Sequence, residues 1–221
     1  MIRQLAFDLP GLDGMTREHF FVAPSNALAL QTVESWQDWP GRKLLLVGPE
    51  GAGKTHLAHI WAAQADALIL PAEHLAETDI ASLSGRAVAV EDADRIGTAE
   101  AQLFHLHNLV IATSALLLTA RTPPRDWGLA LPDLKSRMQA TPIAQLDGPD
   151  DALLSAVLVK LFADRQVAVA ANLIPFLVSR MPRSIAAARA LVAALDARAL
   201  AEGRPITRAL AGDLLDSLFP E

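Results

Sequence analysis

The sequence predicts an α/β fold in which a five-stranded parallel sheet has helices on both faces and is followed by a small all-helical domain. Three observations lead to this prediction. Between Arg42 and Leu146, short aliphatic runs alternate with longer helical stretches, a pattern typical of parallel strands buried on both faces. Beyond Gly148 only helical periodicity remains. With 221 residues the chain is long enough for one large and one small domain.

The five predicted strands are the aliphatic runs before Gly148. In chain order they are residues 43–47 (KLLLV), 67–72 (ALILPA), 87–92 (AVAVED), 116–120 (LLLTA) and 142–146 (PIAQL). Helical stretches separate these runs, and strands joined through helices pair in parallel. We therefore expect one parallel sheet.

The helical domain is predicted to begin where Gly148 and Pro149 interrupt the pattern and Asp150 supplies a helix N-cap. Apolar residues then recur at helical spacing in residues 152–163, 173–181, 184–200 and 207–219. The expected organisation is an N-terminal peptide and linker (1–15), an α/β domain (16–147) and a helical domain (148–221).

Composition restricts the class of protein. Lys and Arg total 19 and Asp and Glu total 25, a net charge of -6, whereas a protein that mainly grips DNA usually presents a basic surface. The absence of Cys excludes disulfide and thiolate chemistry. No apolar run reaches the roughly 18 residues of a membrane span, and the N-terminus lacks a signal-peptide core. We expect a cytoplasmic protein without membrane association.

Residues 48–55, GPEGAGKT, lie directly between the first predicted strand and a helical pattern and fit G-x-x-x-x-G-K-T. Glycines let backbone N–H groups surround an anion, and the helix N-terminus adds positive potential. Lys54 is expected to reach the outer phosphates, and Thr55 to hold Mg²⁺. The motif predicts a site for ADP or ATP. Its expected nucleotide-binding residues are Gly48, Gly51, Ala52, Gly53, Lys54, Thr55 and His56.

Glu91 and Asp92 end the third predicted strand, where nucleotide hydrolases carry carboxylates that bind metal and orient water. Both are candidate Mg²⁺ ligands and catalytic residues. The metal position would carry the longer Glu91 and the water position the shorter Asp92. A displacement of about 1 Å reduces catalysis heavily, so we expect weak intrinsic hydrolysis. The alternative is that both acids only end the strand and face water.

Two arginines are candidates for phosphate chemistry. Arg137 precedes the last predicted strand, and Arg183 begins a helix of the helical domain. Because the guanidinium is always charged and planar, an exposed Arg137 could act in a neighbouring subunit's site, and Arg183 could close over a nucleotide. By residue type alone, a solvated surface charge is the favoured interpretation of Arg137 and an open alternative for Arg183.

The order of these motifs resembles that of AAA+ ATPases, and more narrowly the group of the bacterial replication initiator DnaA and its truncated relative Hda. The stretches that carry the resemblance are HFFVAPSNALAL, GPEGAGKTHLA, LLLTARTPPRDWGLALPDLKSRM and the segment around Arg183. The resemblance implies that the helical domain is a lid and that ADP is the competent ligand. Its implied site residues are Arg137 as arginine finger, Arg183 and Thr119 as nucleotide sensors, and Phe21 and Val22 near the adenine.

The chain opens with apolar residues in QLAFDL, residues 4–9, where termini are usually polar and frayed. This stretch is similar to the short peptides that dock on the sliding clamp of DNA polymerase, its β subunit. Apolar side chains of an extended peptide can enter a preformed pocket on a partner. The alternative is that they pack into the fold itself. The predicted clamp-binding residues are Gln4, Leu5, Phe7 and Leu9.

Together these features predict a nucleotide-bound regulatory adaptor that docks on the sliding clamp and promotes hydrolysis of DnaA-bound ATP through Arg137, which inactivates the initiator. The sequence ends at LDSLFPE without the helix-turn-helix that follows the lid in DnaA, so we expect no direct sequence-specific DNA binding. Two alternatives stay open. One is an autonomous AAA+ ATPase or helicase loader that forms homo-oligomers, and the other is a scaffold without a nucleotide response.

Overall fold

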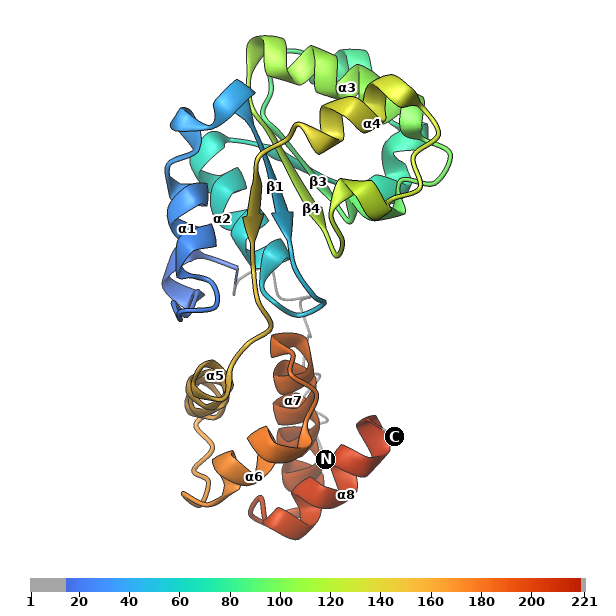
Figure 1. The fold of residues 1–221 in the computed structure, drawn as a ribbon. Helices are drawn as coiled ribbons and strands as arrows, with labels where there is room; N and C mark the ends of the chain where they lie inside the picture. Colours follow the sequence, from blue (N-terminus) through green and yellow to red (C-terminus); the bar gives the residue numbers. More distant parts are fainter. Residues whose placement is uncertain (1–14, 220–221) are drawn as a thin grey trace, which may run out of the picture.

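A computed structural model of the chain describes residues 15–219, apart from the side chains at 111 and 113. The predicted clamp-binding residues Gln4, Leu5, Phe7 and Leu9 lie outside the described residues. The described chain forms an α/β domain followed by a separate group of helices (Figure 1).

The predicted five-stranded parallel sheet is confirmed. Its strands lie in the order β2-β3-β4-β1-β5, and every neighbouring pair is parallel. The strands are β1 (Lys43–Val47), β2 (Leu68–Pro71), β3 (Val88–Glu91), β4 (Leu116–Ala120) and β5 (Ile143–Gln145). Because all strands run the same way, their carboxyl ends meet at one edge, which Figure 1 shows directed toward the helical group.

Three of the strands are shorter than the sequence predicted, each for a local reason. Pro142 has no N–H to donate to a neighbouring strand, and β5 begins after it. At Asp92 the backbone turns to a φ of 52°, which ends β3. At Ala72 a 3-10 helix follows β2.

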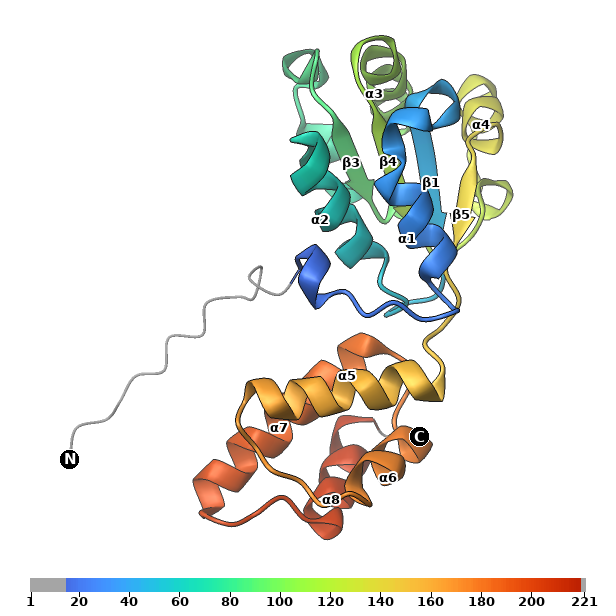
Figure 2. The same cartoon turned by 90° about the vertical axis from the view of Figure 1, so that its left-hand side faces the viewer.

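Helices cover both faces of the sheet (Figure 2). Successive side chains of a strand point to opposite faces, so Leu44 and Leu46 of β1 join one buried cluster, and Leu45 and Val47 join another. The first cluster includes residues of α1 and α2, and the second includes residues of α3 and α4. These helices are α1 (Ala27–Glu34), α2 (Lys54–Ala65), α3 (Glu100–Thr113) and α4 (Pro132–Gln139).

Short 3-10 helices fill the connections of this domain. They are η1 (Arg17–His19), η2 (Trp36–Asp38), η3 (Pro40–Arg42), η4 (Ala72–Glu77), η5 (Ile80–Leu83), η6 (Ala93–Arg95) and η7 (Pro124–Asp126).

The remaining helices have a buried cluster of their own, built around Leu154, Leu158, Leu191 and Leu195. The predicted cap is present, because the Asp150 carboxylate accepts a hydrogen bond from the Leu153 N–H at 2.7 Å. The helices are α5 (Asp151–Asp164), α6 (Leu173–Arg180), α7 (Ile185–Glu202) and α8 (Arg208–Leu218). We call this group the lid.

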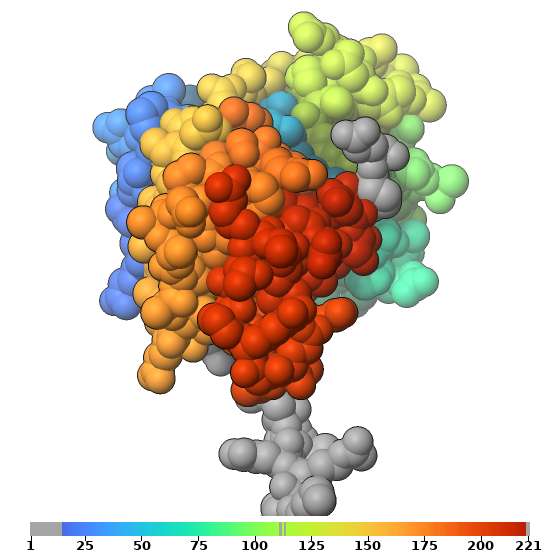
Figure 3. Space-filling view, turned by 90° about the horizontal axis from the view of Figure 1, so that it is seen from below, coloured from blue at the N-terminus to red at the C-terminus, as the bar shows by residue number. Residues whose placement is uncertain are grey.

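The lid covers the edge of the α/β domain where the strands end. Figure 3, seen from the lid side, shows α6 to α8 in orange and red over the middle of this face. Contact between the two parts is direct, since the Ile185 N–H at the start of α7 donates to the Gly51 carbonyl at 3.3 Å. Among the described helices, none combines the length and the apolar character needed to cross a membrane.

Candidate functional site

The loop between β1 and α2 has the backbone of an anion-binding turn. Gly51 and Gly53 have φ values of 74° and 102°, in the region that glycine enters without steric cost. They turn the chain so that α2 begins at Lys54. The first N–H groups of a helix have no intrahelical partner and carry partial positive charge, which suits an anion. The loop therefore has the local geometry that the sequence predicted.

Lys54 is buried, with 8% of its surface exposed. Its ammonium donates to the carbonyls of Gly48 at 2.7 Å and Pro49 at 2.9 Å. Burial lowers the pKa of Lys54, and the nearby carboxylate of Asp92 opposes this shift. An ammonium has three donors, so one stays available beyond these two bonds. Lys54 thus connects its own helix to the start of the loop and places a cation in the lining of the cavity.

A cavity of about 570 Å³ lies between this loop and the lid, within the size range of small-molecule sites. Its polar lining includes Lys54, Thr55, His56 and Asp92. The lining also includes the apolar side chains of Phe20, Phe21, Val157, Leu161 and Ile185. A cavity lined both by an anion-binding loop and by aromatic and aliphatic side chains can accept a nucleotide, whose phosphates and base require those two kinds of contact.

Of the two predicted acids, Asp92 lines the cavity. The backbone N–H of Asp92 donates to the Thr119 hydroxyl at 3.1 Å. Thr119 is buried, and its hydroxyl accepts this hydrogen bond. Glu91 Oε1 is buried, and no hydrogen-bond partner for it is found among the described residues. No group of three or more His, Asp or Glu side chains suited to a metal occurs in residues 15–219. Of the three predicted Mg²⁺ ligands, Thr55 and Asp92 line the cavity and Glu91 does not. All three stay predictions, and Mg²⁺ usually keeps several waters.

Of the residues predicted to contact the adenine or to reach the nucleotide from the lid, one lines the cavity and two do not. Phe21 lines the cavity, whereas 53% of Val22 is exposed and Val22 does not line it. Arg183 lies outside the cavity lining, and its guanidinium pairs with Asp151 at 2.7 Å. Roles for Val22 and Arg183 at a nucleotide stay predictions.

Arg189 lines the cavity from α7 and was missed by the sequence analysis. It is four residues after Ile185, which also lines the cavity. Residues four apart share one face of a helix, so helical spacing was the signal that could have found it. Lys160 of α5 and Arg165, which directly follows α5, add further basic side chains to the lid side of the cavity.

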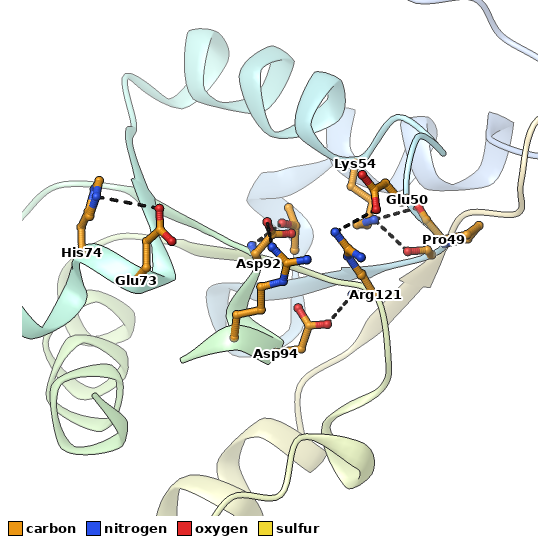
Figure 4. A network of polar contacts seen from close by, with 11 residues as sticks. Pro49, Glu50, Lys54, Glu73, His74, Asp92, Asp94 and Arg121 are labelled. Carbon is orange, nitrogen blue, oxygen red and sulfur yellow. Dashed lines mark hydrogen bonds and ion pairs between the residues drawn. The ribbon is translucent and has the colours of Figure 1, made fainter. Parts of the chain in front are cut away.

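Arg121 is a second missed residue. It directly follows β4 and lines the cavity. The guanidinium of Arg121 lies 2.9 Å from the Glu50 carboxylate (Figure 4). The backbone N–H of Arg121 donates to Asp94 Oδ2 at 3.1 Å. Its position just beyond a parallel strand was the available signal, because ligands bind at the carboxyl ends of such strands.

Comparison with known proteins relates the chain to DnaA. No protein-family profile matches it. It is 24% identical over 233 aligned positions to the chromosomal replication initiator protein DnaA of Cutibacterium acnes, covering 93% of the chain and 47% of that protein. Domain III of Thermotoga maritima DnaA superposes with a TM-score of 0.81 at 18% identity, over 94% of the chain and 98% of that domain. The chain has the fold of DnaA domain III.

A further DnaA structure, bound to AMPPCP and single-stranded DNA, superposes with a TM-score of 0.74 at 14% identity, over 90% of the chain and 70% of that structure. The chain spans about half the length of the Cutibacterium acnes DnaA that it matches. These identities are low, so the structural likeness establishes the fold.

Arg137 lies at the other end of the sheet from the cavity. Its backbone carbonyl accepts from the ammonium of Lys43, the first residue of β1, at 3.4 Å. The loop between β1 and α2, which we call the phosphate loop, begins after Val47, the last residue of β1. At the usual rise per residue of a strand, Val47 lies about 13 Å from Lys43 along β1. The Arg137 guanidinium lies over the Phe104 ring, 5.2 Å from its centre. Arg137 is therefore remote from the cavity of its own chain.

Proposed function

We propose that this protein is a cytoplasmic, nucleotide-bound regulatory adaptor of DNA replication initiation, of the Hda type. In this proposal it docks on the sliding clamp and promotes hydrolysis of the ATP bound to DnaA, which inactivates the initiator. The observation that carries the proposal is the separation of Arg137 from the chain's own phosphate loop, with its backbone carbonyl at the opposite end of β1 and its guanidinium over Phe104.

The proposed ligand is ADP or ATP. Support comes from the glycine turn, the buried Lys54 and the aromatic residues that line the cavity, and from the fold shared with a DnaA structure bound to AMPPCP. Thr55 and Asp92 would hold Mg²⁺, which when bound would neutralise phosphate charge. Ile185 and Gly51 connect the lid to the loop, so a ligand in the cavity would fix the two domains relative to each other.

The proposed chemistry takes place in the site of the partner. An arginine supplied by another subunit stabilises negative charge that develops on the transferred phosphoryl group. Arg137 is suited to this role because it is half-buried on α4 and held over Phe104, so its guanidinium is partly oriented before contact. Its distance from the chain's own cavity favours action on another protein over action on its own nucleotide.

The test uses ATP hydrolysis by DnaA on clamp-loaded DNA. We expect Arg137→Ala to reduce the stimulation on the order of a thousandfold, the usual contribution of an arginine finger. Lys135→Ala is the matched control, because it removes an exposed cation from the same helix. Unchanged stimulation by Arg137→Ala would remove Arg137 from the mechanism. Equal losses in both variants would indicate general electrostatic attraction.

Clamp docking through Gln4, Leu5, Phe7 and Leu9 has a test of its own. Binding of the wild-type protein to the sliding clamp in ADP is compared with binding of Gln4→Ala combined with Leu5→Ala. We expect strong binding by the wild type and loss in the variant. Equal binding by both proteins, or none, would contradict the docking peptide.

An autonomous AAA+ ATPase or helicase loader is the second candidate, favoured by Asp92 lining the cavity beside Lys54. It predicts basal ATP hydrolysis that disappears in Lys54→Ala, together with ATP-dependent homo-oligomers. The adaptor predicts little basal hydrolysis. Measurement of both quantities on the purified chain separates the two candidates.

A further inference from the structure

His107 is a buried polar residue of α3 that has no part in the proposed function so far. Only 1% of its surface is exposed, and its Nε2 lies 3.3 Å from the ammonium of Lys43, the first residue of β1. Burial, followed by the charges of Lys43 and Arg137, lowers the pKa of His107 to about 4, so its imidazole is neutral near pH 7. Because an ammonium can only donate, Nε2 is the acceptor and the ring proton belongs to Nδ1.

Lys43 links this histidine to α4. Its ammonium also donates to the backbone carbonyl of Arg137 at 3.4 Å, and the Thr141 hydroxyl donates to the same carbonyl at 3.0 Å. Arg137 lies in the last turn of α4, where helix carbonyls lack an intrahelical partner and carry partial negative charge. A cation at this position therefore holds the end of α4 against the start of β1.

The side chain of Arg137 is held by α3 as well, and α3 and α4 lie side by side (Figure 1). The guanidinium lies over the Phe104 ring, 5.2 Å from its centre. Phe104 precedes His107 by three residues, so both side chains leave the same face of α3. The charges of Lys43 and Arg137 repel each other, and this repulsion, after burial, lowers the pKa of Lys43. The same repulsion disfavours a guanidinium folded back onto the ammonium.

We propose that Lys43 is a positioning residue for Arg137. Its ammonium, supported by the neutral imidazole of His107, fixes the end of α4 so that the Arg137 guanidinium stays over Phe104 and is presented to a partner in one orientation. This inference rests on the proposed arginine-finger function of Arg137 and deepens it. Positioning matters for such an arginine, because a displacement of about 1 Å can reduce a rate about a hundredfold.

The first test follows the Arg137 side chain in the purified chain by nuclear magnetic resonance. Its Nε–H resonance is assigned by its loss in Arg137→Lys, and the Phe104 ring displaces it from its ordinary shift. Lys43→Met keeps an apolar stem and removes the ammonium. We expect it to move the resonance at least halfway to the value in Phe104→Leu. Lys43→Arg, which restores a cation, should leave the resonance close to its wild-type value.

The second test titrates the chain into DnaA on clamp-loaded DNA and measures ATP hydrolysis. Lys43→Met should lower the maximal stimulated rate about tenfold, less than the loss for a full 1 Å displacement. The concentration that gives half-maximal stimulation should stay within twofold, because the docking surfaces are unchanged. Lys43→Arg should recover most of the rate. Lys135→Met, which removes an exposed cation from α4, is the matched control and should change neither quantity.

Three results would overturn the inference. They are an Arg137 resonance that does not move in Lys43→Met, a maximal rate in Lys43→Met within twofold of the wild-type value, and a loss of rate that Lys43→Arg does not recover. If Arg137→Ala itself leaves the stimulation unchanged, the proposed function of Arg137 is wrong. The role of Lys43 in that function is then wrong too, and the resonance still decides whether Lys43 holds the Arg137 side chain.

Discussion

The contact between Gly51 and the lid gives the most direct test of the structural reasoning. A Cβ atom at Gly51 would lie 2.7 Å from the Ser184 Cβ and 3.0 Å from its Cα, and closer still to its hydroxyl oxygen. Ordinary contacts of a Cβ are at 3.4 Å or more. Gly51→Ala must therefore push α7 away from the loop, in addition to straining a backbone with a φ of 74°.

The two costs can be separated by a matched variant. Gly128 has a φ of 68°, and a Cβ there would meet nothing within 4 Å. Gly128→Ala should cost about 1 kcal/mol, because left-handed strain of about 1–2 kcal/mol is partly offset by the reduced entropy of the unfolded chain. Gly51→Ala also loses the Ile185–Gly51 hydrogen bond, which adds about 1 kcal/mol. We expect a total near 2 kcal/mol.

The assay is urea unfolding of both variants, followed by ADP binding. Because the lid supplies one wall of the cavity, Gly51→Ala should weaken ADP binding about tenfold, or 1.4 kcal/mol, while Gly128→Ala should not. Adding Ser184→Gly removes the clashing side chain, and glycine is a tolerable N-cap, so part of the affinity should return. Equal unfolding costs in both variants, with no rescue by Ser184→Gly, would refute the proposed clash.

Two further predictions concern the residues around Arg137. Burial is the main cause that lowers the pKa of His107 from 6.5 to about 4, and Lys43 adds to it; between these pH values the unfolded chain binds the proton more readily. The free energy of unfolding should therefore fall by up to about 3 kcal/mol as the pH decreases from 6.5 to 4. In urea unfolding, His107→Leu should reduce this dependence of the free energy of unfolding on pH, and His105→Leu, at an exposed site, should leave it unchanged. The same pH dependence in His107→Leu as in the wild type would contradict the burial argument. Phe104→Leu removes the ring under Arg137, a contact of about 0.5–1 kcal/mol, so it should lower the stimulation of DnaA hydrolysis two- to fivefold with ADP affinity unchanged. Full stimulation by Phe104→Leu would show that the ring does not orient Arg137.

Features carried by contiguous residues were predictable. Leu44 to Val47 are aliphatic without interruption because both faces of β1 are covered, so the sequence pattern reports their environment directly. The phosphate loop is likewise one run of residues whose glycines are required by its backbone. Asp150 was identifiable as an N-cap because its bond to Leu153 is local.

Features that join distant segments were not predictable. Arg121 and Glu50 are far apart in the chain and meet because β4 pairs with β1. Arg189 reaches the cavity only because the lid packs against the loop. Arg183 pairs with Asp151, which is 32 positions earlier in the chain, and no sequence pattern indicated this ion pair. Its role at a nucleotide stays a prediction.

The sequence by itself determined the α/β class, the parallel sheet, the phosphate loop and the helical lid, because strand burial, turn chemistry and helix caps are local properties. Only the tertiary structure decided which charged side chains meet in the cavity, and that Arg137 lies at the far end of the sheet from it. The physical reason is that strand order and lid packing set those distances, and neither is encoded in any single stretch of residues.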